Sequence, residues 1–145
     1  MTARPSQDLW ITKWEEINRK IANLAGEFPE EHLDHRPAEH LRTFGEVLRH
    51  LAFWNQYVAD VLRGRKADDS ANEVSLAEYP TRARMIGVLG ESSEAVVAAL
   101  KDSEGDTKTI ELLITFIEHS GEHYGQLAVY ARLIGITPPA SRGEA

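Results

Sequence analysis

Apolar residues recur along this chain with helical spacing in four separate segments. They are expected to form helices from about Asp8 to Ala25, Thr43 to Gly64, Thr81 to Asp102 and Thr109 to Ile134. No alternating run typical of a β-strand competes with them. The chain is therefore predicted to be all-α.

Two polar connections in this pattern are long, from Glu27 to Arg42 and from Arg65 to Pro80. We expect a four-helix bundle with two long inter-helix connections, which permit parallel neighbours or crossovers. The connection from Ser103 to Thr107 is short, and it predicts that the third and fourth helices are antiparallel neighbours. A chain of this length suits a single domain, which we assign to residues 1–145.

Several helix ends carry recognisable signals. Gly26 is expected to end the first helix, Gly64 the second and Gly135 the fourth. Thr43 followed by Glu46 has the spacing of a capping box at the start of the second helix.

Composition narrows the possible functions. The chain has a net charge of −7, and no strong basic patch offsets it, so nucleic-acid binding is not expected. No apolar run approaches the ~20 residues of a membrane span, and Met1 to Asp8 lacks the pattern of a signal peptide. Cysteine is absent, which excludes disulfides, thiolate ligands and a cysteine nucleophile. We expect a cytoplasmic protein whose partner is a small-molecule substrate.

Three histidines stand out within the apolar stripes. His119 and His123 are four residues apart, so both lie on the inward face of the fourth helix, and His50 lies on the buried side of the second. A lone buried histidine is most simply a core residue with one hydrogen bond. Two imidazoles on one inward face need a partner that satisfies both, and a divalent metal does so. We predict a metal site at His119 and His123, which His50 could complete as a third imidazole from another helix, with zinc or nickel favoured among several suitable ions.

Other patterns compete with this interpretation. The run His119 to His123 also matches H-x-x-E-H, an inverted zinc-peptidase motif, but the further downstream glutamate that such a site needs is lacking except for Glu144 near the end. Glu122 is interpreted as a solvated charge. His32, His35 and His40 cluster in the first long connection, where they are expected to be solvated.

The order of these elements resembles a known family, the DinB/YfiT-like superfamily. The resemblance rests on His50 within the second helix, on H-x-x-x-H-x-G-Q at His119 to Gln126, and on Leu-x-Gly-x-x-Pro-Pro at Leu133 to Pro139. It covers about Trp10 to Pro139. Family members commonly carry a histidine or an arginine where this chain has Tyr124.

The resemblance implies a four-helix bundle that holds a divalent metal through three histidines, which become His50, His119 and His123. Characterised relatives include S-transferases that use bacillithiol or mycothiol and a mycothiol-dependent maleylpyruvate isomerase. By resemblance we expect a metal-dependent enzyme, either a thiol-dependent S-transferase or an isomerase, acting on an electrophilic small molecule with a low-molecular-weight thiol. A metal-dependent hydrolase and a non-catalytic stress-response binding protein remain open alternatives.

Four further residues are candidates near the site. Glu46, one turn before His50, could orient its imidazole or only close the capping box. Trp14, Trp54 and Tyr130 have core spacing, and some could line a pocket beside a metal. A homodimer is also expected, because bundles of this family often dimerise and the N-terminal helix carries Trp10 and Trp14.

Overall fold

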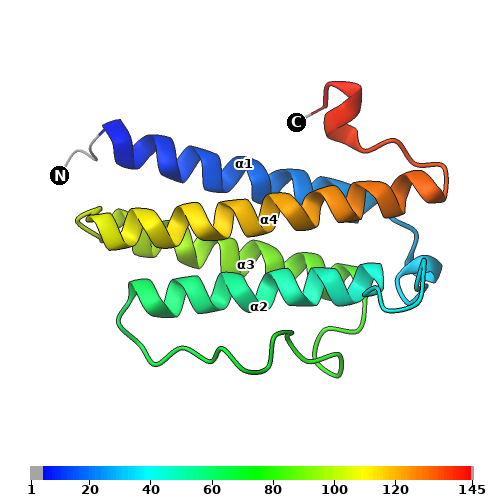
Figure 1. Cartoon of the computed structure of the whole chain (residues 1–145), viewed down its shortest axis with the longest axis horizontal. Coiled ribbons are helices and arrows are strands. Elements are labelled where there is room, and N and C mark those ends of the chain that lie inside the picture. Colours follow the sequence, from blue (N-terminus) through cyan, green and yellow to red (C-terminus); the bar gives the residue numbers. More distant parts are fainter. Residues whose placement is uncertain (1–4, 145) are drawn as a thin grey trace.

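Four long helices make up most of the chain, and no strand occurs in the part that the computed structural model describes, residues 5–144 with side chains from residue 7 (Figure 1). They are α1 (Pro5–Glu27), α2 (Phe44–Leu62), α3 (Arg82–Lys101) and α4 (Thr107–Leu133), with short 3₁₀ segments η1 (Glu30–His32) and η2 (Pro139–Arg142). The predicted all-α four-helix bundle is confirmed. Residues 1–4 and 145 lie outside the described residues. They belong to the predicted 1–145 domain, and residues 1–4 are half of the segment considered for a signal peptide.

The helices occupy the corners of a square. The closely packed pairs are α2 with α3, α1 with α3, α1 with α4, and α2 with α4, so α3 and α4 lie across a diagonal. In Figure 1, α1 and α4 run in one direction and α2 and α3 in the other.

The prediction that the third and fourth helices are antiparallel neighbours is therefore right about direction and wrong about adjacency. Axes of packed helices lie ~8–10 Å apart, which makes the diagonal of the square about 11–14 Å. The residues from Asp102 to Asp106 join the two helices, and five extended residues can reach about 17 Å. A short turn is thus long enough to cross the diagonal.

The second long connection, residues 63–81, returns along the full length of the bundle below α2 (Figure 1). It allows α2 and α3 to pack as parallel neighbours, one of the arrangements that the long connections were expected to permit. The same path carries this loop past the middle of α2.

Most of the expected helix ends are present. The Thr43 hydroxyl accepts a hydrogen bond from the Glu46 backbone at 3.1 Å, and the Glu46 carboxylate accepts one from the Thr43 backbone at 3.0 Å, which completes the capping box. Gly64 and Gly135 have φ of 71° and 85° just beyond α2 and α4, a conformation that glycine adopts without strain.

Gly26 does not end the first helix, and this prediction was wrong. Helix α1 continues to Glu27. The next residue, Phe28, is buried and stacks on Phe44 with ring centroids 3.6 Å apart. Because the helix must continue past Gly26 to deliver this ring to the core, tertiary packing overrides the local glycine signal.

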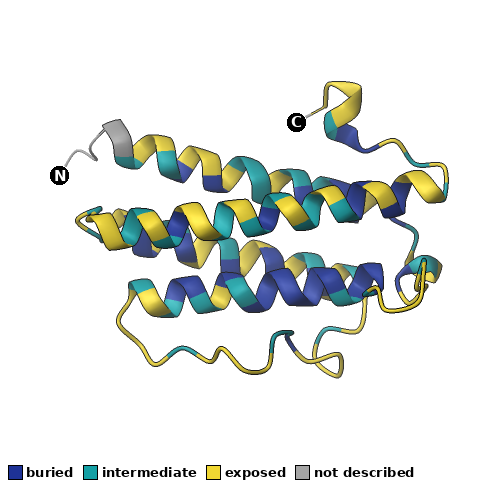
Figure 2. Ribbon diagram, viewed as in Figure 1, coloured by how far each residue is buried: buried dark blue, intermediate teal, exposed yellow. Residues whose placement is uncertain are grey.

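The apolar core has two parts, and α2 is buried over a wide arc, as expected (Figure 2). One cluster surrounds Phe28 and Phe44, and the other surrounds Trp14. Buried polar side chains include Asn55, which donates to Asn18 at 3.1 Å across the α1–α2 diagonal. Along α4, the two candidate histidines follow Leu113 of one cluster and precede Leu127 of the other.

No helix among the described residues is long and apolar enough to span a bilayer.

Candidate metal centre

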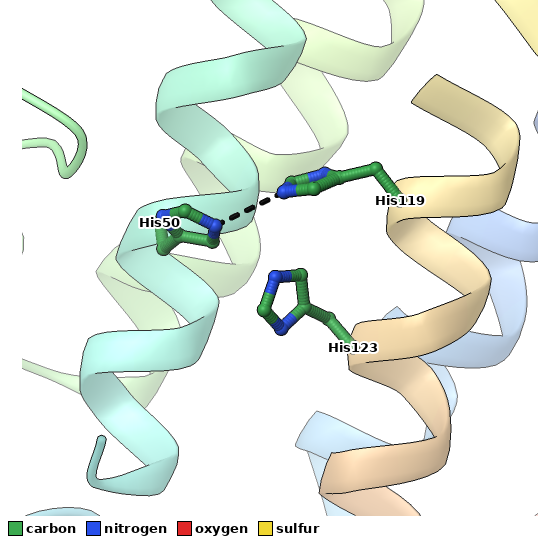
Figure 3. Close-up of side chains that lie close together, drawn as sticks. All are labelled: His50, His119 and His123. Atoms are coloured by element: carbon green, nitrogen blue, oxygen red, sulfur yellow. Dashed lines mark hydrogen bonds between the residues drawn. The ribbon is translucent and has the colours of Figure 1, made fainter. Parts of the chain in front are cut away.

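The three candidate histidines meet in space. His50 projects from α2, and His119 and His123 project from successive turns of α4, which packs against α2 (Figure 3). One nitrogen from each ring can be chosen so that all three lie within 4.8 Å of one another. The i, i+4 spacing sets the pair on α4, while the packing of α2 against α4 brings in the third ring.

The spacing of these nitrogens fits a metal site. The Nε2 atoms of His50 and His119 lie 3.0 Å apart. Imidazole nitrogens bound to zinc at ~2.0–2.1 Å in a tetrahedral arrangement are about 3.3 Å from one another. Small ring movements would therefore bring all three nitrogens to bonding distance of one ion, and three imidazoles leave one position of a tetrahedron for another molecule.

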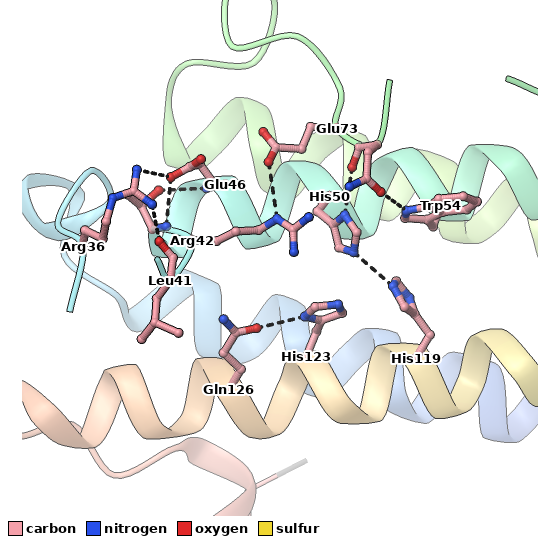
Figure 4. Close-up of polar contacts among 12 residues, drawn as sticks. Arg36, Leu41, Arg42, Glu46, His50, Trp54, Glu73, His119, His123 and Gln126 are labelled. Atoms are coloured by element: carbon pink, nitrogen blue, oxygen red, sulfur yellow. Dashed lines mark hydrogen bonds and ion pairs between the residues drawn. The ribbon is translucent and has the colours of Figure 1, made fainter. Parts of the chain in front are cut away.

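The other ring nitrogen of His50 is held by a loop. Its Nδ1 lies 2.8 Å from the backbone oxygen of Asn72, in the connection between α2 and α3 (Figure 4). A carbonyl oxygen can only accept, so Nδ1 must donate its proton and Nε2 keeps its lone pair. This outer hydrogen bond fixes the tautomer and the ring orientation that a metal ligand needs.

Asn72 holds a second group near the site. Its side-chain oxygen accepts from the indole N–H of Trp54 at 2.8 Å, and its backbone has φ of 67°, a left-handed conformation that asparagine tolerates better than most residues. The hydrogen bond from Val74 N to Arg49 O, 3.2 Å long, attaches the next turn of the loop to α2. The loop is thus pinned where it supports His50.

Glu46 does not orient His50, in contrast to one of the two expectations for it. Its carboxylate is engaged by the Thr43 backbone and by Arg36 at 3.0 Å (Figure 4). Partial burial is the largest single effect on the pKa of Glu46 and raises it. The hydrogen bonds from Thr43 and the charge of Arg36 together outweigh burial and hold the pKa below its usual value. The structure assigns the support of His50 to Asn72 and the capping of α2 to Glu46.

A chain of hydrogen bonds fixes the tautomer of His123. The backbone oxygen of Arg42 accepts from the Tyr130 hydroxyl at 2.7 Å, and that hydroxyl accepts from the Gln126 amide nitrogen at 2.8 Å. The amide oxygen of Gln126 then lies 2.9 Å from His123 Nδ1. Because the Arg42 carbonyl can only accept, the direction of each hydrogen bond in this series is fixed. Nδ1 of His123 must therefore donate its proton to Gln126. Its Nε2 lone pair is left for a metal.

Two rings of the cluster are kept neutral by their surroundings. Burial lowers the pKa of His50 to about 4, a shift that the Asn72 hydrogen bond opposes and the charge of Arg42 assists. Burial also lowers the pKa of His119 to about 4, with the neighbouring His123 and His50 contributing. Neutral imidazole is the form that binds metal, so the site is prepared for an ion at neutral pH.

Aromatic side chains flank one side of the cluster. The rings of Trp54 and Phe116 stack at 5.6 Å, and Tyr57 packs against both at 5.0 and 5.7 Å. Trp54 also meets His119 edge to face at 6.3 Å. These three rings, Trp54, Tyr57 and Phe116, are called the aromatic wall below.

The other aromatic candidates have different roles. Trp14 is fully buried, and its indole N–H donates to Ser93 at 3.1–3.2 Å, so it packs between α1 and α3. Tyr130 supports His123 through Gln126, as described above. Tyr124 packs with Lys20, whose ammonium lies 4.7 Å from the ring centroid, so the side chain is engaged by α1.

The competing patterns do not form a comparable site. Among the described residues, only His50, His119 and His123 form a group with metal-ligand geometry. His35 and His40 are exposed, and His32 meets His35 only through ring edges at 6.5 Å. Glu122 is exposed, as expected for a solvated charge.

Sequence reasoning missed Asn72 and Gln126 as supporting residues. Asn72 lies in a polar loop, and nothing in the local sequence indicates that this loop folds back on α2. Gln126 was quoted within the H-x-x-x-H-x-G-Q motif, and its position three residues after His123 could have suggested contact on one helical face.

The sequence model of the DinB superfamily matches residues 13–127, most of the chain, and this range contains all three histidines. No curated protein matches the chain.

Proposed function

The chain belongs to the DinB superfamily, and on that premise we propose that it is a divalent-metal-dependent enzyme that uses a low-molecular-weight thiol. His50, His119 and His123 are the proposed ligands, and zinc or nickel the proposed ion. The reaction is a thiol transfer to, or an isomerisation of, an electrophilic small molecule.

The observation that carries this proposal is the direction of the protons around the cluster. His50 and His123 both donate Nδ1–H outward, to Asn72 and Gln126, and therefore turn unprotonated Nε2 atoms inward. A purely structural histidine needs no convergent lone pairs. Two inward lone pairs with a third imidazole beside them suit a cation.

The chemistry follows from the donor set. A divalent ion held by three neutral imidazoles lowers the pKa of a thiol or a water that it coordinates. Since the chain contains no cysteine, the thiol must come from a separate small molecule. We also propose a cytoplasmic location, where such thiols are kept reduced.

Two alternatives use the same residues. A hydrolase would employ water in place of the thiol, and a non-catalytic binding protein would hold metal and ligand without turnover. The partly exposed aromatic wall beside the cluster favours an enzyme that accepts an organic substrate over a site that only stores metal.

The test begins with protein purified without a histidine tag and reconstituted with zinc or nickel. Elemental analysis should give about one ion per chain. The loaded protein should then accelerate the reaction of an epoxide with a low-molecular-weight thiol above the rate that the thiol and the epoxide show without protein.

Metal content close to zero would reject the whole proposal. Metal binding with thiol-independent hydrolysis would support the hydrolase, and metal binding with no turnover across the panel would support the binding protein.

A further inference from the structure

A polar cavity of about 490 Å³ opens beside the histidine cluster, between the two long connections, α2 and α4. Arg36, Arg42, Glu46, Glu73 and Gln126 are among its lining residues. The cavity is adjacent to the cluster, because the Gln126 amide oxygen lies 2.9 Å from His123 Nδ1. Its volume falls within the ~300–1,000 Å³ of small-molecule sites.

Of the two arginines in this cavity, Arg36 is already occupied. It donates to the Glu46 carboxylate at 3.0 Å and to the Leu41 backbone oxygen. Glu46 also closes the capping box, so this group is part of the start of α2.

Arg42 is differently placed. Its Nε lies 3.5 Å from a Glu73 oxygen, while its two terminal nitrogens donate no hydrogen bond to any residue of the described chain. The side chain is about one-third exposed, and it lines the cavity. Glu73 holds the guanidinium at Nε and leaves its two terminal nitrogens available. This pair of nitrogens has the geometry that binds a carboxylate through two parallel hydrogen bonds.

The position of Arg42 relative to the cluster is also fixed. Its backbone oxygen accepts from Tyr130 at 2.7 Å, which ties the residue to α4. Its guanidinium extends between Glu73 and Gln126 toward His50 (Figure 4). The pKa of His50 is lowered chiefly by burial, and the positive charge of Arg42 lowers it further.

The aromatic wall lies on the opposite side of the histidines from Arg42. In Figure 4, Arg42 and Gln126 are on one side of the cluster and Trp54 on the other. Phe116 and Trp54 meet His119 at ring-centroid distances of 5.7 and 6.3 Å. The cationic fork of Arg42 and the apolar rings therefore flank the histidine cluster on opposite sides.

We propose that the substrate is a carboxylate with an apolar or aromatic body, its carboxylate bound by the terminal nitrogens of Arg42 and its body lying against the aromatic wall. The inference rests on the proposed function, because it assigns a substrate class to that metal site. Arg42 is a binding residue here, and it determines specificity for anionic substrates.

The test measures binding by calorimetry, with benzoate as the probe and benzamide as its neutral counterpart. Both are titrated into zinc-loaded and metal-free protein. Benzoate should bind both forms, and more tightly than benzamide or acetate. Arg42→Gln should weaken benzoate by about tenfold or more, since a charge-assisted hydrogen bond is lost, and Arg42→Lys should weaken it less.

Arg36→Gln is the matched control, because Arg36 lines the same cavity but is already paired, and it should change benzoate affinity by less than about twofold. Circular dichroism should confirm that each variant folds. The inference is overturned if Arg42→Gln binds benzoate as tightly as the parent protein, or if Arg36→Gln weakens benzoate binding and Arg42→Gln does not. Acetate binding as tightly as benzoate would overturn the part played by the aromatic wall.

The metal-free titration keeps the two proposals separate. If the protein holds no zinc, the proposed function fails, yet the benzoate series still tests Arg42. If zinc binds and benzoate affinity requires zinc but survives Arg42→Gln, the carboxylate contacts the metal, so the substrate inference fails while the proposed function stands.

Discussion

The Nε2 atoms of His50 and His119 are within hydrogen-bonding distance, 3.0 Å, and they join α2 to α4. Since Asn72 requires His50 to carry its proton on Nδ1, the proton between the two rings belongs to His119. Binding of an ion through both Nε2 atoms requires that proton to move to Nδ1 of His119. An ion bound through both Nε2 atoms would take the place of this hydrogen bond.

His123→Ala should abolish metal binding and leave a folded bundle. Two remaining imidazoles are too few to hold a divalent ion against water. The substitution leaves a small cavity and an unpaired Gln126 amide, at a cost of about 1–3 kcal/mol in unfolding free energy. Elemental analysis and urea unfolding check both expectations.

Glu122→Ala is the matched control for that variant, because Glu122 is the exposed neighbour of His123 on the same helix. Its metal content should be unchanged. Full metal in His123→Ala, or loss of metal in Glu122→Ala, would refute the assignment of the three histidines as ligands.

Metal-free protein should lose stability as the pH falls from about 6.5 to about 4. Burial holds the folded-state pKa of His50 and His119 at about 4, while both titrate near 6.5 when unfolded. As the pH falls, the unfolded state therefore takes up protons before the folded state does. The contribution of the two neutral rings to the free energy of unfolding is intact above pH ~6.5 and is lost on acidification. After allowance for partial exposure, the loss should be on the order of 2–3 kcal/mol.

Urea unfolding at neutral pH and at about pH 4.5 measures this loss. His119→Gln should reduce it, and His35→Gln, a change at an exposed loop position, should not. Equal pH dependence in the parent protein and His119→Gln would contradict the assignment of the loss to the cluster.

Metal should raise the melting temperature at pH values where the rings are neutral. An ion present at one hundred times its dissociation constant stabilises the folded state by about 2.7 kcal/mol, or roughly 5–10 °C for a chain of this size. Differential scanning calorimetry with zinc and then with excess chelator measures the shift. No difference between the two samples would mean that the ion does not bind preferentially to the folded state.

Asn72→Gly and Asn72→Ala should differ in metal affinity. Both remove the side-chain oxygen that accepts from Trp54, at a cost of about 1 kcal/mol. Glycine tolerates φ of 67°, so the carbonyl that holds His50 stays in place. Alanine is strained there by roughly 1–2 kcal/mol, and displacement of the carbonyl should weaken metal binding about tenfold or more.

Competition with a zinc-binding dye compares the two variants. Equal affinity in both, close to that of the parent protein, would show that the Asn72 carbonyl does not support the site.

The protein should be a homodimer at micromolar concentration. Trp14, one of the two residues on which this expectation is based, is fully buried and cannot contact a partner. Apolar side chains that could do so are Leu9 of α1 and Val129 and Leu133 of α4, which are more than half exposed. These helices are neighbours. Light scattering should give twice the protomer mass of 16.2 kDa, and a value near the protomer mass would refute the dimer.

The parts of the fold that local periodicity determines could be predicted from the sequence. The four helices and the capping box at Thr43 depend on residues within one or two turns, and His119 and His123 share a face because they are four residues apart. The resemblance to the family added His50, on another helix.

Features that depend on packing between distant segments could not be predicted. The diagonal placement of α3 and α4 is set by all four helices together, and α1 continues past Gly26 because Phe28 is buried in the core. Asn72 supports His50 only because its loop returns along α2. No local pattern encodes any of these contacts.

The distribution of ligands along the chain has a consequence for how the protein matures. Two of the three proposed ligands lie on the last long helix, and His119 is 69 positions after His50. During synthesis, a chain that has not yet produced α4 offers an ion one imidazole of the three. Unlike a zinc finger, whose ion drives folding, a protein with this proposed ligand set would complete its bundle first and acquire its ion afterwards. Supply of the metal would then limit how much of the protein is active, without limiting how much of it folds.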